Sequence, residues 1–325
     1  MKLKLYLPVI YCLLCFNYAF AQKQNVYFLK KNGKEVKVRD SADYIRILTE
    51  PDSGTTFYNV KEYYKNGKFK LVGKSSKVEY NSLEGQCVFY YPSGSKQQVA
   101  NYKQNFLMGD VYDFYPNGKL HTYKQYKSKP EPGHAVEVLM LACNDSTGKV
   151  LAANGNGYYI WYSNDFKNVV EEGNIKAGLR DGKWKGSNGN EKDLLTFEED
   201  YNNGKLIQGR SLTHQDNKSF TYTIREVTPQ YPGGVNEFYK FIAQNVKYPY
   251  NARMNHIQGE VFTSFVVEAD GSLSDIKIVR SPDAELSEET LRVIKLSPNW
   301  IPGAYFGRPA RVQYTVPTRF TLGSH

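Results

Sequence analysis

The chain has 325 residues, a formal charge of +9 and 27 tyrosines. This length suits two domains, since one hydrophobic core usually serves about 100–200 residues. The sequence contains no phosphate-binding loop, nucleophile elbow or Cys-x-x-Cys motif, and its five histidines are scattered, with no pair at metal-ligand spacing. We therefore expect a protein that is not an enzyme and that binds neither a metal nor a cofactor.

Residues 1–21 have the layout of a secretory signal peptide. Lys2 and Lys4 precede an apolar stretch from Leu5 to Phe16, and Ala19-Phe20-Ala21 is an A-x-A cleavage signal. The alternative is a retained inner-membrane helix, for which the stretch is short because a span needs about 20 apolar residues. We expect cleavage and export to the periplasm or cell envelope.

Two cysteines, Cys87 and Cys143, follow the predicted signal peptide. In an oxidising compartment they could form a disulfide. They could equally be two buried thiols in separate hairpins, because sequence gives no distance between them. Both alternatives stay open at this point.

The positive charge is unevenly distributed. Loss of Lys2 and Lys4 lowers the formal charge from +9 to +7, and from Glu226 onward ten basic side chains balance ten acidic ones. The excess between Gln22 and Arg225 indicates either an anionic partner, such as lipid headgroups, lipopolysaccharide or acidic glycan, or a lysine-coated face that keeps strand edges from pairing. Nucleic acid is not an expected partner of an exported chain.

Residues 22–215 are a tyrosine-rich repeat region punctuated by Asn-Gly. Residues 31–34 and 65–68 both read Lys-Asn-Gly-Lys, and related turns occur at Pro116-Asn117-Gly118-Lys119 and Asn203-Gly204-Lys205. Asn-Gly is typical of the type I′ hairpin, whose two central residues need positive φ. Aromatic pairs such as Tyr63-Tyr64 precede most turns, with a period of about 25 residues.

We expect these repeats to be an array of stacked β-hairpins. A single hairpin is barely stable in water, so the aromatic pair of each unit would cover its neighbour. The stretch from Gly173 to Trp184 resembles the cadence of MORN-like repeat proteins of the bacterial type. The tyrosines are either structural or a platform for glycan or peptidoglycan, which would make the protein a structural, cell-wall-associated scaffold.

Residues 226–325, behind a linker at 216–225, predict a small α+β domain of two helices on a three-stranded antiparallel sheet. Val235, Phe238, Ile242 and Val246 would form the apolar face of the first helix, and Leu291 and Ile294 that of the second. The expected elements are a helix over 234–246, strands over 259–269 and 273–280 joined by Asp270-Gly271, a helix over 284–296, a turn at Pro302-Gly303 and a strand over 311–320. Pro317 lacks an N–H, which places the last strand at a sheet edge.

The motifs of this domain resemble the C-terminal domain of TonB, the periplasmic energy transducer. The matching residues are Tyr248-Pro249, Gly259-Glu260-Val261, Asp270-Gly271 and Trp300 to Gly303, led by a "YPGG…F" segment that begins at Tyr231. The resemblance covers residues 226–325. It implies docking to outer-membrane receptors, with a receptor segment called the TonB box added as a strand to the sheet.

The resemblance also implies which residues bind the partner. They lie in the last strand and just before Pro249, where this chain has Asn-Val-Lys-Tyr-Pro in place of the family's usual Q-P-x-Y-P. The residues are Asn245, Val246, Lys247, Tyr248, Arg311, Val312, Gln313, Tyr314, Thr315 and Val316. The implied partner is an outer-membrane TonB-dependent receptor or another periplasmic protein. Inner-membrane motor proteins join only if the N-terminal segment is retained, and homodimerisation is left open.

Two features differ from a transducer. The segment from Leu3 to Ala21 contains no histidine, which the family carries in its membrane helix, and hairpin repeats replace the family's Pro-rich linker. Docking in support of energy-dependent transmembrane transport is therefore favoured over energy transduction by this chain itself.

Overall fold

The computed structural model describes residues 24–78, 82–127, 136–190 and 193–322. The chain divides into two compact units, Met1–Val138 with Ser146–Gly148, and Leu139–Asp145 with Lys149–His325. The predicted signal peptide lies outside the described residues. Among the described residues, none of the helices has the length and apolarity needed to cross a membrane.

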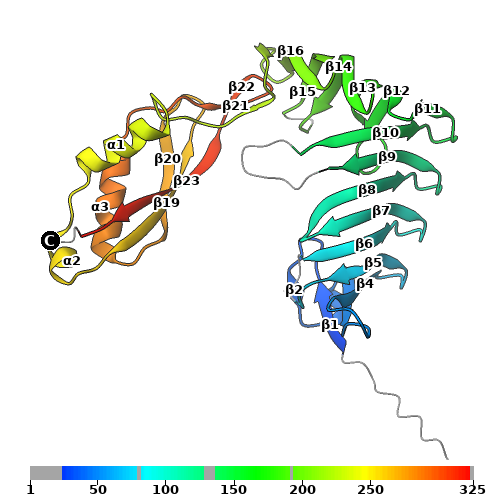
Figure 1. Cartoon of the computed structure of the whole chain (residues 1–325), viewed down its shortest axis with the longest axis horizontal. Coiled ribbons are helices and arrows are strands. Elements are labelled where there is room, and N and C mark those ends of the chain that lie inside the picture. The colour runs from blue at the N-terminus through cyan, green and yellow to red at the C-terminus, as the bar shows by residue number, and fades with distance from the viewer. Residues whose placement is uncertain (1–23, 79–81, 128–135, 191–192, 323–325) are drawn as a thin grey trace, which may run out of the picture. The chain divides into compact units, whose positions relative to one another are not determined.

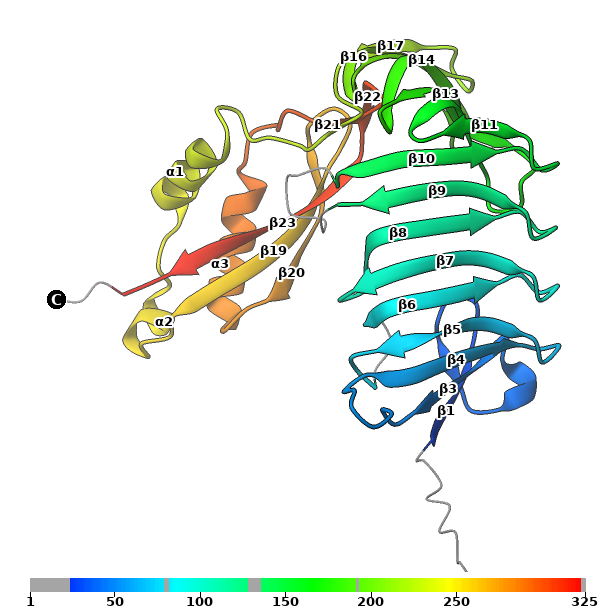
Figure 2. The same cartoon turned by 45° about the vertical axis from the view of Figure 1, so that its right-hand side comes forward.

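The first unit is an antiparallel meander. Each strand from β3 to β9 pairs with the next (Figure 2), and β1 pairs with β2 and β3. The elements are β1 (Gln24–Leu29), β2 (Glu35–Val36), the 3-10 turn η1 (Arg39–Ser41), β3 (Tyr44–Thr49), β4 (Tyr58–Tyr64), β5 (Phe69–Ser75), β6 (Leu83–Tyr90), β7 (Lys96–Lys103), β8 (Phe106–Phe114) and β9 (Leu120–Tyr126).

The second unit begins with a further array of antiparallel strands, each paired with the next from β10 to β17. The strands are β10 (Val138–Asn144), β11 (Val150–Ala153), β12 (Asn156–Tyr162), β13 (Val169–Lys176), β14 (Leu179–Asn188), β15 (Leu195–Asn202), β16 (Lys205–Thr213) and β17 (Ser219–Tyr222). The expected all-β hairpin array is confirmed. Strand β17 lies within residues 216–225, where we expected a linker, so the array continues to Tyr222.

The Lys-Asn-Gly-Lys turns are not of the expected type I′. The N–H of Tyr64 donates to the Lys68 carbonyl and the N–H of Gly67 donates to the Tyr64 carbonyl, both at 2.9 Å, and only the glycine has positive φ, at 79°. This is a type I turn followed by a left-handed glycine. Asn66 stays out of the left-handed region because its Oδ1 accepts the Lys68 N–H at 3.0 Å.

A type I′ turn does form at Asn203-Gly204, where φ is 48° and 81°. There the two residues directly join the paired residues Asn202 and Lys205. The prediction of type I′ is therefore correct for this two-residue loop and wrong for the three-residue loops.

Side chains of one turn donate to carbonyl groups of the next turn in the first unit. Tyr64 Oη donates to the Tyr90 carbonyl at 2.8 Å and Asn66 Nδ2 to the Pro92 carbonyl at 2.9 Å. Asn117 Nδ2 donates to the Ser146 carbonyl at 2.8 Å. The ammonium groups of Lys68 and Lys119 likewise donate to carbonyls of the following turns, so part of the lysine excess serves the array itself.

We expect Asn117→Ala to destabilise the chain more than Asn32→Ala. Both substitutions remove the bond that a lysine N–H donates to the side-chain oxygen, at 3.0 and 3.1 Å respectively, but only Asn117 also bonds the following turn. The difference should be about 0.5–1.5 kcal/mol, the net value of one hydrogen bond. Urea unfolding of the two variants measures it, and equal losses would contradict a stabilising role for the bonds between turns.

Both cysteines are free and buried, Cys87 in the first unit and Cys143 in the second. Burial raises the pKa of both thiols. Of the two alternatives left open by the sequence, the structure has the separate thiols, each packed in the apolar core of its own array.

The C-terminal region is an α+β layer. Strands β20-β19-β23 form an antiparallel sheet in that order, and helices α1 and α3 lie on one of its faces (Figure 1). The elements are β18 (Glu226–Val227), α1 (Val235–Asn245), α2 (Tyr250–Met254), β19 (Gly259–Val267), β20 (Leu273–Arg280), α3 (Ala284–Lys295), β21 (Gly303–Tyr305), β22 (Arg308–Ala310) and β23 (Val312–Phe320). The predicted fold class is confirmed, with the short helix α2 and a small sheet β18-β21-β22 in addition.

The helix faces differ from expectation at two positions. On α1, Phe238 and Ile242 are buried as predicted, whereas Val235 in the first turn is 59% exposed. On α3, Ile294 is buried but Leu291 is only half-buried. The buried face of α3 is instead made by Leu286, Thr290, Val293 and Ile294.

A cluster of aromatic rings explains the "YPGG…F" segment. The ring of Trp300 lies 5.7 Å from that of Tyr231 and 5.3 Å from those of Phe238 and Phe265. Between Tyr231 and Phe238, the chain turns through Gly233 and Gly234, whose φ values of 83° and 88° favour glycine. The motif thus brings both aromatic side chains onto one tryptophan.

The prediction of a turn at Pro302-Gly303 is wrong. Gly303 begins strand β21, and the chain reverses four residues later at Phe306-Gly307, between the paired residues Tyr305 and Arg308. The sequence pattern did not predict this hairpin, which we call the β21–β22 hairpin (Gly303–Ala310).

Candidate functional site: the edge strand of the C-terminal sheet

Strand β23 is an edge of its sheet. It pairs with β19 through nine consecutive residue pairs, from Val312 opposite Val267 to Phe320 opposite Gly259, without a register shift. In the part of the chain that the structure describes, no other strand pairs with it. One side of β23 therefore presents main-chain groups that a further strand can bind.

Pro317 fixes which main-chain groups face outward. It lies opposite Phe262 within the ladder, and proline has no N–H to share with a partner. In an antiparallel ladder such a pair is of the type that exchanges no hydrogen bonds. The main-chain groups of Gln313, Thr315, Pro317 and Arg319 consequently point away from β19, and those of the intervening residues point toward it.

The side chains of β23 alternate in the same way. Val316, Thr318 and Phe320 are buried beneath the helices, while Gln313, Thr315 and Arg319 are exposed. The outward edge therefore offers three N–H donors, because Pro317 supplies only its carbonyl. An added strand meets uninterrupted donors only on the Val312–Val316 side of Pro317.

Arg311 holds the start of β23 in place. Its Nε donates to both carboxylate oxygens of Glu268 at 2.9 and 3.1 Å, and Nη2 contacts Asp275 at 2.5 Å. A hydrogen bond from Ser274, together with Arg311, lowers the pKa of the Glu268 carboxyl. Arg311 thus links β23 to the other two strands through its side chain.

The segment Asn245–Tyr248 is already bonded to α3. The Asn245 carbonyl accepts a hydrogen bond from Arg292 at 2.7 Å, and the Lys247 N–H donates to Glu289 at 2.6 Å. The ring of Tyr248 packs edge-on against Phe320, 5.6 Å away. Val246 packs between the two apolar clusters of the region.

The two predicted groups of site residues therefore lie at opposite ends of one strand. Tyr248 contacts Phe320, the last residue of β23, whereas Arg311 precedes its first residue. Nine residues of extended strand span about 30 Å. A single added strand reaches both groups only if it runs along all of β23.

The comparisons with known proteins concern this region. Residues 244–322 match the model of the family described as Gram-negative bacterial TonB protein C-terminal. Two curated relatives, each called Protein TonB and from two strains of Helicobacter pylori, are 34% identical over 93 residues, which is 27% of this chain and 33% of each relative. Residues 244–322 belong to the TonB C-terminal domain family. The chain spans only about a third of the length of these relatives.

Two solved structures are also similar to this TonB C-terminal domain. Both are NMR solution structures of the C-terminal domain of Helicobacter pylori TonB. One is 28% identical, covers 28% of this chain and 95% of that chain, and has a TM-score of 0.22. The other is 30% identical, covers 29% of this chain and 89% of that chain, and has a TM-score of 0.23.

The β21–β22 hairpin fastens the TonB C-terminal domain to the last strands of the array. Phe306, at its tip, is 2% exposed and packs with Leu195, Phe197 and Tyr222. Ser211 Oγ donates to the Phe306 carbonyl at 2.7 Å, and the Phe306 N–H donates to the Arg225 carbonyl at 2.6 Å. Phe306 has a φ of 50°, a conformation that is costly for a bulky residue.

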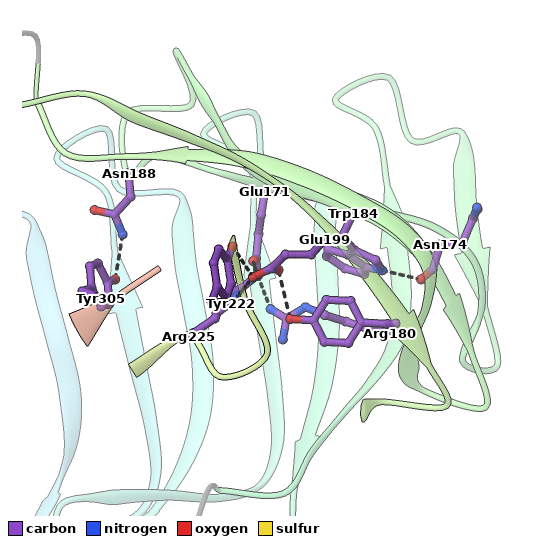
Figure 3. A network of polar contacts seen from close by, with 10 residues as sticks. Glu171, Asn174, Arg180, Trp184, Asn188, Glu199, Tyr222, Arg225 and Tyr305 are labelled. Carbon is purple, nitrogen blue, oxygen red and sulfur yellow. Dashed lines mark hydrogen bonds and ion pairs between the residues drawn. The ribbon is translucent and has the colours of Figure 1, made fainter. Parts of the chain in front are cut away.

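A partly buried charge network surrounds this junction. Arg225 lies between two carboxylates (Figure 3): its Nε donates to Glu199 at 2.7 Å and its Nη2 to Glu171 at 3.0 Å. Tyr222 Oη and Tyr201 Oη also donate to Glu199, at 2.9 and 3.0 Å. The Arg225 guanidinium carbon is 5.0 and 5.1 Å from the ring centres of Phe197 and Phe306. Nothing in the sequence pattern indicated this network.

We expect the network to make the free energy of unfolding depend on pH in the acid range. Burial by itself raises the pKa of the Glu171 carboxyl, but the charges of Arg180 and Arg225 outweigh it, so the pKa lies below its usual value. The stabilisation is then complete above the unfolded pKa of about 4.3 and is lost as the pH falls through the lower folded pKa.

Glu171→Gln tests this dependence. Urea unfolding between pH 7 and pH 3 should show a stability gap between the native chain and the variant that narrows at the acid end of this range. A gap that stays constant throughout would contradict the ionised pairing of Glu171 with Arg180 and Arg225.

Proposed function

We propose that the TonB C-terminal domain of this protein docks to an outer-membrane TonB-dependent receptor, or to another envelope protein, by strand addition. A short extended segment of the partner pairs with the outer edge of β23, in support of energy-dependent transmembrane transport. The protein works in the cell envelope, with the periplasm as its compartment, and its role is binding without catalysis.

The observation that carries this proposal is the unpaired edge of β23. Strand addition draws its affinity from main-chain hydrogen bonds and its selectivity from alternate side chains. On this edge the main-chain groups of Gln313 and Thr315 point outward next to exposed side chains. The partner segment therefore binds beside Val312–Val316, before the missing donor at Pro317.

The segment Asn245–Tyr248 has a different role in this proposal. Since the Asn245 carbonyl and the Lys247 N–H are bonded to Arg292 and Glu289, they do not form main-chain bonds to a partner. The side chain of Lys247 is exposed. It offers a positive charge to the part of the partner segment that extends beyond the end of β23.

A peptide titration tests the proposal. A synthetic peptide containing the TonB box of a receptor from the same genome is titrated into the full-length chain by isothermal calorimetry. We expect saturable binding with one peptide per chain. The control peptide has N-methylated main-chain nitrogens at alternate positions, so that it cannot pair along one edge, and it should not bind. The absence of detectable binding of the unmodified peptide would remove the proposal.

The tyrosines favour docking over the scaffold alternative. Tyr64 Oη and Tyr91 Oη donate to the carbonyls of Tyr90 and Phe114, at 2.8 and 2.7 Å. The rings of Tyr112 and Tyr123 stack on each other at 4.6 Å. These contacts give the tyrosines a structural use within the array, so a glycan platform is not needed to explain them.

A further inference from the structure

A cavity of about 620 Å³ lies in the first unit, beside strands β1, β3 and β4. Its volume is in the range of small-molecule sites, about 300–1,000 Å³. Its apolar lining includes Val26, Phe28, Ile45, Ile47 and Tyr63, and the η1 turn contributes Arg39 and Asp40. Docking through β23 does not involve this cavity.

The floor of the cavity is apolar because of the strand register. Val26 lies opposite Ile47, and Phe28 lies opposite Ile45, which in turn lies opposite Tyr63. These side chains share one face of the sheet, and Val26 is 49% exposed.

The other face of the same strands is already a packed core. There Arg46 and Leu48 are each 3% exposed. The array therefore buries one face and leaves a cluster of half-exposed aliphatic and aromatic side chains on the other. Contact with an apolar ligand would stabilise the complex by about 25 cal/mol for each Å² of apolar surface removed from water.

The rim of the cavity is positively charged. Arg39 and Lys65 both line it, and neither forms an ion pair with another residue that the structure describes. Asp40 is the one acidic side chain among the described lining residues. The basic groups therefore outnumber the acidic groups around an apolar floor.

We propose that this cavity binds an anionic amphiphile with a single apolar chain, such as a long-chain carboxylic acid. The chain lies on Val26, Phe28, Ile45 and Ile47. The headgroup lies at Arg39 and Lys65, which donate charge-assisted hydrogen bonds to it. This occupant explains both the half-exposed apolar face and the two cations that form no ion pair within the described part of the chain, whereas a neutral apolar ligand explains only the first.

Fluorescent cis-parinaric acid tests the proposal on the full-length chain. We expect saturable binding of the acid, and binding of its methyl ester weaker by roughly ten-fold or more, since the ester lacks the charge that the rim recognises. Equal affinities for acid and ester would overturn the headgroup assignment. Failure of the acid to bind saturably would overturn the whole proposal and leave docking at β23 unaffected.

Two variants locate the bound molecule. Arg39→Gln/Lys65→Gln should weaken binding of the acid to the level of the ester and leave the ester unchanged. Val26→Gln, on the exposed part of the floor, should weaken both probes. The matched control Lys77→Gln/Lys103→Gln removes the same charge at exposed sites outside the cavity lining. An equal loss in this control, or full binding by Val26→Gln, would show that the probe binds elsewhere.

Discussion

Replacement of Phe306 by alanine will lower the free energy of unfolding of the second compact unit by about 3–5 kcal/mol, the usual cost of removing a buried phenylalanine ring. The ring is 2% exposed and lies 4.7 Å from that of Phe197 and 5.6 Å from that of Tyr222. Its loss leaves a cavity at the point where the β21–β22 hairpin meets the array. Urea unfolding followed by circular dichroism measures the change.

Phe306→Gly is the matched comparison. Glycine usually destabilises a folded chain more than alanine, by about 0.5–1 kcal/mol. At a φ of 50° the order should reverse, because the left-handed conformation costs an L-residue about 1–2 kcal/mol that glycine avoids. A loss below about 1 kcal/mol in Phe306→Ala would show that the hairpin is not docked in solution.

Gln313→Pro should weaken binding of the TonB-box peptide by roughly 5- to 150-fold. The substitution removes one outward N–H from the edge of β23, and the partner carbonyl left unpaired costs about 1–3 kcal/mol. The fold should survive, because the N–H of Gln313 does not take part in the ladder with β19, as Pro317 already illustrates four residue pairs further along. Peptide titration and an unfolding curve together check both statements.

Two further variants control for other effects of Gln313→Pro. Gln313→Ala removes the same side chain, whose Nε2 donates to Ser264 Oγ at 2.9 Å, but keeps the main-chain donor, so it should bind the peptide like the native chain. Tyr314→Pro removes an N–H that points toward β19 and should destabilise the sheet by about 1–3 kcal/mol, because a ladder hydrogen bond is lost and its acceptor is left unpaired. If Gln313→Pro and Gln313→Ala bind the peptide equally well, the partner does not pair with β23.

Local signals predicted the elements of the C-terminal sheet closely. The strand over 273–280 has the predicted bounds, and α3 begins one residue after Asp283, whose carboxylate caps the N–H groups of Glu285 and Leu286. Pro317 correctly placed β23 at an edge. These signals depend on neighbours within a few residues, so they can be read without knowledge of the tertiary structure.

The β21–β22 hairpin could not be predicted in this way. Its turn uses Phe306 at positive φ, where phenylalanine is unfavourable, while the nearby Pro302-Gly303 is a stronger turn signal by composition. Contacts with residues such as Ser211, 95 positions earlier, hold the unfavourable turn in place. A tertiary interaction thus overrides the local preference.

The candidate site was predicted only in part, because some of its contacts are also tertiary. The edge position of β23 follows from one proline, but the bonds from Arg292 and Glu289 to the segment Asn245–Tyr248 join residues more than 40 positions apart. Side-chain choice also decided the turns, since Asn66 Oδ1 accepts the Lys68 N–H and makes the expected positive φ at asparagine unnecessary.

The bonds from each turn to the next have a consequence for how the array can evolve. Donors at Tyr64 and Asn66 contact main-chain carbonyls 26 positions later, and Tyr91 contacts one 23 positions later. Because the acceptors are backbone groups, any hairpin with the same turn can take the next place in the series. Whole repeats can therefore be duplicated or deleted between homologous proteins. This lengthens or shortens the array, while every remaining turn keeps a neighbouring turn with which it can form hydrogen bonds.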